Sequence, residues 1–204
     1  MKNGQILLYG KDINDYTRTE LAKKIGFVEQ MNHVARNDDS VRDYIVEGRT
    51  PYLSSFAVPN ESDYAAAEEC AYAVGCEALL DKRLSQLSGG ELQMVLIARA
   101  LTQDTPIIVM DEPMSALDLA NQIVILKLIR ELNTEGKTIL LSTHNPNHAF
   151  VLGCQVGILN EGTVTGHGDC REVLTQDAIA RVFGNGISIL KIENDTYCEI
   201  DSMR

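Results

Sequence analysis

Asp111 and Glu112 are adjacent acids that follow the apolar run Ile107–Met110 and precede Pro113. In an open α/β sheet, ligands bind beyond the carboxyl ends of the strands, so these carboxylates stand where a metal ion could be held or a proton taken. A solvated turn before the proline is the plainer interpretation of the pair taken alone. Polar residues at the ends of other strands would favour a site.

His144 and Gln30 occupy the same kind of position. His144 ends the stretch "KTILLSTH", and Gln30 follows the strand-like run Ile25–Val28 at the end of "GFVEQ". A single histidine at a strand end is usually a hydrogen-bonded structural residue. Polar groups at three strand ends are harder to dismiss together, and they predict that Gln30, His144 and the acidic pair converge on one sheet edge.

The stretch Leu87–Leu101 places two glycines at the start of a helix. Ser88 as N-cap and Glu91 three residues later form a capping box, which explains how the helix begins. The box does not explain Gly89 and Gly90, because each glycine costs a helix about 1 kcal/mol relative to alanine. Bare amides at a helix start can bind phosphate, so we interpret Ser88, Gly89 and Gly90 as a phosphate site.

The elements that position these residues alternate between strand-like and helical runs, which is typical of an α/β fold with a mainly parallel sheet. The apolar segment Leu119–Leu132 has the length of a crossover helix between two parallel strands. We expect strands at Gln5–Tyr9, Ile25–Val28, Pro106–Met110 and Thr138–Ser142, a hairpin around Val156–Thr165, two short helices after Gly168, and a strand pair around Ile187–Ile200.

The character of the sequence changes between Gln30 and Ser88, where alanine-rich helical patterns surround a proline-containing loop. We predict a helical lobe over residues 31–85, inserted into an α/β body made of residues 1–30 and 86–204. The lobe joins the body next to Gln30, so a shift of that residue could move the lobe as a hinged unit.

Composition excludes several classes of function. The 204 residues carry 29 acidic and 18 basic side chains, a net charge of −11, which argues against nucleic-acid binding through bulk electrostatics. The longest apolar runs are too short to span a membrane, and the first residues do not read as a signal peptide. Five cysteines lack C-x-x-C spacing, so we expect reduced thiols rather than disulfides or zinc ligands.

Five motifs resemble those of the ABC ATPases in order and spacing. They are a signature "LSGGE" (Leu87–Glu91), a Walker B motif "IIVMDEP" (Ile107–Pro113), a D-loop "SALD" (Ser115–Asp118), a switch histidine in "LLSTHN" and a Q-loop glutamine in "GFVEQ". The resemblance runs from about Gly4 to Gly184. It implies a P-loop-NTPase-like fold, with helices on both faces of the sheet and an inserted helical lobe. "VEGRTPYL" and "DYAAAEECAYAVG" are similar to the branch that imports iron–siderophore complexes, haem and cobalamin.

The resemblance implies a role for each polar residue at the strand ends. Asp111 would hold Mg²⁺, and Glu112 would polarise the water that attacks ATP as general base. His144 would stabilise the γ-phosphate. Gln30 would touch Mg²⁺ and report the nucleotide state to the lobe.

It also implies partners. Ser88, Gly89 and Gly90 would bind the γ-phosphate of an ATP held by a second ABC ATPase subunit. Asp118 would lie at that dimer interface, although it could equally be the N-cap of the following helix. The lobe would contact a transmembrane permease, and the protein would lie in the cytoplasm on the inner face of the cell membrane.

Two departures from the family are visible. Met114 stands where the family usually has Thr or Ser. The motif G-x-x-x-x-G-K-[ST], whose amides and lysine hold the β- and γ-phosphates, does not occur in residues 1–204, and "GKD" at Gly10–Asp12 does not match it. We therefore expect a sequence truncated before the P-loop, without the N-terminal strands and P-loop helix of the family, whose residues 1–204 alone bind and hydrolyse ATP weakly if at all.

Two alternatives stay open. The chain could be a partner subunit that supplies only the signature half of an ATP site and has no ATPase activity of its own. A DNA-repair or chromosome-maintenance ATPase shares these motifs, but such proteins usually carry long coiled-coil or zinc insertions before the signature, and none appears here.

Overall fold

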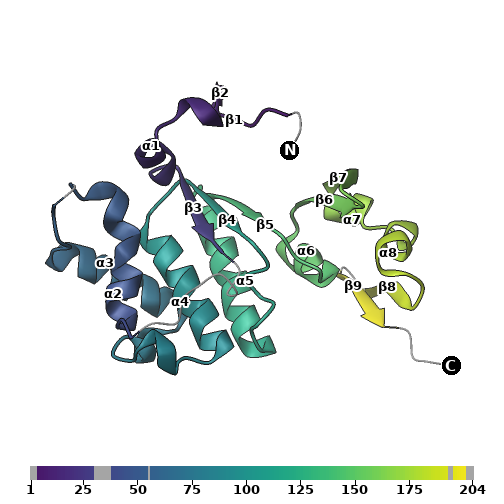
Figure 1. The fold of residues 1–204 in the computed structure, drawn as a ribbon. Coiled ribbons are helices and arrows are strands. Elements are labelled where there is room, and N and C mark those ends of the chain that lie inside the picture. The colour runs from purple at the N-terminus through teal and green to yellow at the C-terminus, as the bar shows by residue number, and fades with distance from the viewer. Residues whose placement is uncertain (1–3, 30–37, 55, 193–194, 201–204) are drawn as a thin grey trace. The chain divides into compact units, whose positions relative to one another are not determined.

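The computed structural model describes residues 4–29, 38–54, 56–192 and 195–200. The chain forms two compact units, Met1–Ser142 and Thr143–Arg204. Figure 1 labels the elements of both. The predicted lobe boundaries at residues 31–85 do not coincide with this division, and they stay a prediction.

A three-stranded parallel sheet forms the centre of the first unit. Its strands are β3 (Ile25–Val28), β4 (Ile107–Met110) and β5 (Thr138–Leu141), with β4 in the middle. All three were expected within one residue of these bounds. The strand expected at Gln5–Tyr9 is shorter, and β1 (Leu7–Leu8) pairs antiparallel with β2 (Lys11–Asp12).

The two faces of the central sheet differ. Alternate residues of a strand point to opposite faces. On one face Val28, Ile108 and Met110 are buried. On the other, Phe27, Val109 and Leu140 are paired across the three strands, and Phe27 and Leu140 are 54% and 63% exposed. Within the first unit, the described residues thus bury one face of this sheet more deeply than the other.

Helices make up most of the described sequence between β3 and β4, where the sequence predicted a helical lobe. Figure 1 shows α2 and α3 beside α4, and α4 also packs against β3. The helices after β3 are α2 (Val41–Val46), η3 (Glu47–Tyr52), α3 (Glu61–Val74), η4 (Glu77–Leu79), η5 (Leu84–Gln86) and α4 (Gly89–Thr102). Two short helices precede β3, η1 (Ile13–Asp15) and α1 (Arg18–Ala22). The helix α5 (Leu119–Thr134), expected at Leu119–Leu132, follows β4.

Gly48 lies in η3 at a place where this helix passes close to the backbone of α4. A Cβ atom at Gly48 would lie closer to the backbone oxygen of Arg99 than any normal van der Waals distance, and 3.1 Å from Thr102 Cβ. The helix α4 cannot shift easily to make room for a Cβ atom, because most of its residues are buried. The close approach therefore requires glycine.

We expect Gly48→Ala to destabilise the protein by about 1–3 kcal/mol, because overpacking against a backbone oxygen forces two helices apart. Urea unfolding measures the change. Gly157→Ala is the matched control, since its Cβ would meet only Val164 Cγ1 at 3.9 Å, an ordinary contact. Equal unfolding midpoints for the two variants would contradict the close approach.

The described residues of the second unit form three helices and two antiparallel strand pairs. Its core contains Phe150, Cys170 and Ile179. Glu161 and Gly162 both have positive φ (47° and 77°), as a two-residue type I′ hairpin requires. The elements are α6 (Pro146–Leu152), β6 (Gln155–Asn160), β7 (Thr163–Asp169), α7 (Cys170–Val173), α8 (Gln176–Phe183), β8 (Ile187–Ile192) and β9 (Asp195–Ile200).

The sheets are mixed rather than mainly parallel. Among the described strands, only β3, β4 and β5 run parallel, while the other six form antiparallel pairs. No helix in the described part of the chain is both long and apolar enough to cross a membrane. The five cysteines are free thiols.

Candidate functional site

Asp111 lies immediately beyond the end of β4, between its two neighbouring strands. Its backbone N–H donates to the carbonyl oxygen of Val28 on β3 at 3.0 Å. On the other side, the N–H of Ser142, which follows β5, donates to Met110 O at 3.0 Å. Parallel pairing thus continues past the strands and holds Asp111 at the carboxyl edge of the sheet, where the sequence predicted it.

Glu112 adopts a left-handed backbone conformation, with φ +46°. This region is uncommon for a residue with a Cβ atom and is enriched at functional sites. Hydrogen bonds hold the peptide groups on both sides of it: Glu112 N–H donates to Ser142 Oγ at 2.9 Å, and Glu112 O accepts from the N–H and Oγ of Ser115 at 3.1 and 3.0 Å. The turn fixes the direction in which the Glu112 side chain leaves the backbone.

Ser142 joins the two acids. Its Oγ donates to Asp111 Oδ1 at 2.6 Å and accepts the Glu112 N–H. Sequence reasoning did not single out this residue, although it ends the expected strand Thr138–Ser142. The sequence feature that could have identified Ser142 is its hydroxyl at the end of a strand, since Asp111 and Glu112 follow the end of a neighbouring strand.

Asp118 is the N-cap of α5. Its Oδ1 accepts the N–H of Asn121 at 2.8 Å. The capping role weighed from the sequence is therefore confirmed, and a role at a dimer interface stays a prediction. Met114 is buried within the same turn region, where its carbonyl accepts from the Gln122 side chain at 3.3 Å.

Ser88 caps α4 through the predicted capping box. Ser88 N–H donates to Glu91 Oε2 at 2.8 Å, and Glu91 N–H donates to Ser88 Oγ at 3.3 Å. A Cβ at Gly90 would lie 3.2 Å from Ala116 O, so this glycine also allows the helix start to approach the segment before Asp118. Gly90 thus has a packing reason within the chain, beside the phosphate site that stays a prediction for Ser88, Gly89 and Gly90.

Glu91 is strongly acidic. The Lys82 ammonium, 2.8 Å from Glu91 Oε1, and the hydrogen bonds from Ser88 lower the pKa of Glu91 from 4.5 to about 2. Because the pKa is depressed on folding, the ionised carboxylate stabilises the protein fully above pH 4.5. That contribution is lost as the pH falls toward 2.

We therefore expect wild type and Glu91→Gln to differ most in stability near neutral pH, and the difference to shrink between pH 4.5 and pH 3. Urea midpoints at a series of pH values measure it. Lys82→Gln should weaken the pH dependence of the difference, because it removes the largest cause of the low pKa. A constant difference from pH 7 to pH 3 would contradict the assignment.

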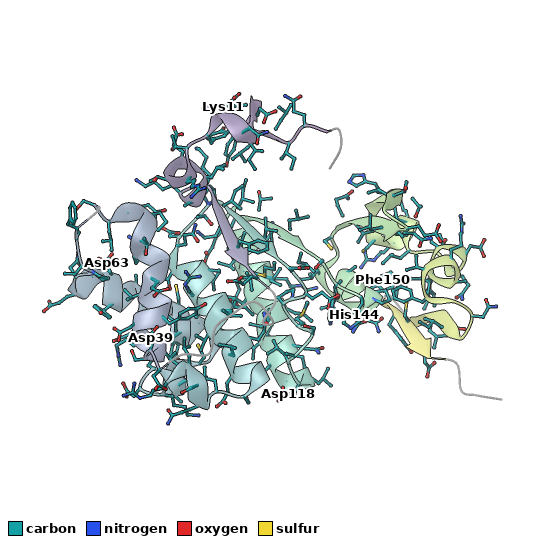
Figure 2. All side chains as sticks on the ribbon, viewed as in Figure 1. Lys11, Asp39, Asp63, Asp118, His144 and Phe150 are labelled. Atoms are coloured by element: carbon teal, nitrogen blue, oxygen red, sulfur yellow. The ribbon has the colours of Figure 1, made fainter. Side chains whose placement is uncertain are left out.

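His144 immediately precedes Asn145, the N-cap of α6, and Phe150 lies within that helix (Figure 2). The turn around His144 is held by its neighbours: Thr143 Oγ1 and His148 Nδ1 are 2.8 Å apart, and Asn145 caps α6 through the N–H of Asn147. Burial, with a smaller effect of His144, lowers the pKa of His148. The convergence of His144 on the acidic pair stays a prediction, and Gln30 lies outside the described residues.

The acidic pair suits a hard cation. In the part of the chain described above, no group of three or more His, Cys, Asp or Glu side chains could hold a metal ion by itself. Mg²⁺ is commonly held by one or two carboxylates together with water and substrate phosphates, so a single Asp111 carboxylate at the sheet edge fits it.

Comparison with known proteins decides the family. Residues 1–115 match the ABC transporter family. The chain belongs to the ABC transporter family. An uncharacterised ABC transporter ATP-binding protein of Haemophilus influenzae is 35% identical over 96% of this chain and 74% of its own length. The ferric enterobactin transport ATP-binding protein of Escherichia coli is 33% identical over 89% and 67%. The iron(3+)-hydroxamate import ATP-binding protein of Bacillus subtilis is 35% identical over 88% and 67%.

Solved ABC structures share the fold. A protein described as a metal-chelate type ABC transporter in an inward-facing conformation matches with a TM-score of 0.76 and 29% identity, over 89% of this chain and 73% of that one. A dimeric ATP-binding cassette bound to ADP and Pi matches with a TM-score of 0.72 and 30% identity, over 83% and 74%. The ABC ATPase fold predicted from the motifs is thus confirmed.

Proposed function

We propose that this chain is the ATP-binding subunit of an ABC importer and couples ATP hydrolysis to uptake of an iron–siderophore, haem or cobalamin-type substrate. The single observation that carries the proposal is the acidic pair Asp111–Glu112, held at the carboxyl edge of a parallel sheet. The names of relatives, among them ferric enterobactin and iron-hydroxamate ATP-binding proteins, support the substrate class. They do not favour the alternative of a partner without ATPase activity.

Each predicted residue has a role in this proposal. Asp111 would hold Mg²⁺, which would supply positive charge to compensate the phosphates, and Glu112 would take the proton of the attacking water. His144 would contact the γ-phosphate, and Gln30 would help to hold Mg²⁺. Phosphoryl transfer is catalysed mainly by positioning and charge stabilisation, so the fixed backbone of Glu112 is the supporting feature.

The site is shared between two subunits in this proposal. Ser88, Gly89 and Gly90 bind the γ-phosphate of the nucleotide held by a second ABC ATPase subunit, and Asp118 lies at the interface. A solved relative of the same fold is a dimeric cassette. The chain is held at the inner face of the cell membrane through a permease.

ATP turnover also requires a P-loop, which residues 1–204 do not contain. We expect residues 1–204 alone to bind Mg·ATP weakly and to hydrolyse it immeasurably. Joining them to a P-loop-bearing segment of another family member gives a completed cassette, which should bind and hydrolyse ATP as a dimer. Calorimetry and phosphate release test both. Tight Mg²⁺-dependent ATP binding by residues 1–204 alone would show that the loop is dispensable, and an inactive dimer of the completed cassette would oppose the ATPase role.

The permease contact is proposed for the helical segment near Arg49 and Tyr52. Arg49 is already engaged by Asp63 at 3.2 Å and lies 4.5 Å from the Tyr52 ring centre, so the accessible positions are Tyr52, which is 40% exposed, and Phe56 on the adjoining loop. A photoreactive phenylalanine at Tyr52 or Phe56 should crosslink to a co-expressed permease. Tyr9 is the control. Crosslinks from Tyr9 alone would reject the contact.

A further inference from the structure

We propose that Ser142 is a positioning residue for phosphoryl transfer, which sets the carboxylate of Asp111 and the backbone of Glu112 at the same time. The inference rests on the proposed function of these two acids. It goes beyond the family motifs, since none of the five motif roles implied by the resemblance falls on Ser142.

The geometry of the hydroxyl carries the inference. A serine hydroxyl has one proton to donate and lone pairs to accept with. The short 2.6 Å contact directs the proton to Asp111 Oδ1, as expected for an O–H donating to a carboxylate. The lone pairs are then available to the Glu112 N–H, which lies 2.9 Å away. One group therefore holds the Asp111 carboxylate and the Glu112 backbone amide at the same time.

The backbone of Ser142 is itself held in place. Its N–H donates to Met110 O, the last residue of β4, at 3.0 Å. The hydroxyl thus reaches the acidic pair from the neighbouring strand end, and sheet register sets its position. A displacement of β5 along β4 would change both hydrogen bonds together.

The hydrogen bond from Glu112 N–H to Ser142 Oγ helps to hold Glu112 in its left-handed conformation. A non-glycine residue with φ +46° persists only where its surroundings hold it. Ser115 holds the carbonyl side of Glu112, and Ser142 holds the amide side. Removing the Ser142 hydroxyl takes away this acceptor of the Glu112 N–H, so the direction in which the Glu112 side chain leaves the backbone is held less firmly.

Asp111 is affected in a different way. The hydrogen bond to Oδ1 restrains rotation of the carboxylate and leaves Oδ2 for a cation or its bound water. Removing the hydroxyl should therefore change the Mg²⁺ dependence of hydrolysis as well as the rate. A residue that only stabilised the fold would not alter the Mg²⁺ dependence.

The test uses a graded series, Ser142→Thr, Ser142→Cys and Ser142→Ala. In residues 1–204, NMR hydrogen exchange of the Glu112 amide should be about tenfold or more faster in Ser142→Ala, and near wild type in Ser142→Thr. In the completed cassette, Ser142→Ala should lower kcat and raise the Mg²⁺ concentration for half-maximal hydrolysis, each by about 10–100-fold. Ser142→Thr should restore most of both, with Ser142→Cys between, because a thiol is a weaker hydrogen-bonding group.

Ser40→Ala is the matched control. Ser40 makes the same two kinds of hydrogen bond at the start of α2, donating to Asp43 Oδ2 at 2.6 Å and accepting Asp43 N–H at 3.0 Å. Its loss should lower stability but leave the Mg²⁺ dependence unchanged. If Ser142→Ala does not fold, the thiol and threonine variants decide alone.

Two outcomes distinguish the positioning role of Ser142 from the proposed function of the acidic pair, on which it rests. If Glu112→Gln abolishes turnover while the Ser142 series matches wild type in amide exchange, kcat and Mg²⁺ dependence, the positioning role is wrong and the proposed function stands. If Glu112→Gln leaves turnover unchanged, the proposed function of the acidic pair is itself wrong.

Discussion

Glu112→Gln should lower ATP turnover by the completed cassette about 10²–10⁴-fold, the range that general-base catalysis contributes. The amide keeps the size of the side chain but cannot accept the proton of the attacking water. Nucleotide binding should change much less, because the substitution leaves the Asp111 carboxylate and its hydrogen bond to Ser142 in place. Phosphate release at saturating Mg·ATP measures the loss, and equilibrium nucleotide binding is measured beside it.

Glu161→Gln is the control for this substitution. Glu161 also has a left-handed backbone, φ +47°, but it occupies the hairpin turn between β6 and β7. The same chemical change in the same backbone conformation should leave turnover unchanged. If both variants lose activity equally, a general effect of these turns on folding would explain the result better than base catalysis.

Asp63→Ala should destabilise the protein by about 3 kcal/mol, because it removes a buried carboxylate together with the hydrogen bonds that the carboxylate accepts. Asp63 is 5% exposed and makes two kinds of contact: Oδ1 accepts from Arg49 Nε at 3.2 Å, and Oδ2 accepts the Asn60 N–H at the start of α3 at 3.0 Å. Those hydrogen bonds, the Asn60 one foremost, lower the pKa of Asp63, so the carboxylate is ionised at neutral pH. Its removal leaves Arg49 without its charge partner.

Asp81→Ala provides the comparison for Asp63→Ala. Asp81 also pairs with an arginine, Arg42, at 3.3 Å, but its side chain is 94% exposed. Exposed pairs contribute about 0–1 kcal/mol, so this variant should unfold close to wild type. Urea unfolding of both variants checks the prediction. Equal losses would mean that burial of Asp63 does not govern the strength of its pair.

The sequence predicts the central strands and α5 well for identifiable reasons. Apolar runs such as Ile107–Met110 end in charged or small polar residues, and Asp118 caps the helix after them. Ser88 and Glu91 form the expected box, because capping depends on residues three apart in one helix turn. These features are local, so a single sequence carries them.

What the sequence does not reveal depends on register and close packing. The hydrogen bonds of Ser142 arise only once β5 is aligned with β4, and no periodicity in the sequence sets that alignment. Glu112 has a left-handed φ, but a glutamate does not indicate this conformation in a sequence as a glycine would. The approach of Gly90 to Ala116 likewise joins two motifs that are separate in the sequence, the signature and the D-loop.

The pairing of β3 with β4 also constrains how the chain can fold. These strands are neighbours in the sheet, yet Ile25 pairs with Ile107, and the whole helical segment lies between them in sequence. Closing so long a loop costs entropy before any strand hydrogen bond is gained. Contacts among α2, α3 and α4 join residues much closer in sequence and can form earlier. Compaction of these helices would bring the two strand ends together, so variants that loosen the helical segment, Gly48→Ala among them, should also slow the folding of the sheet.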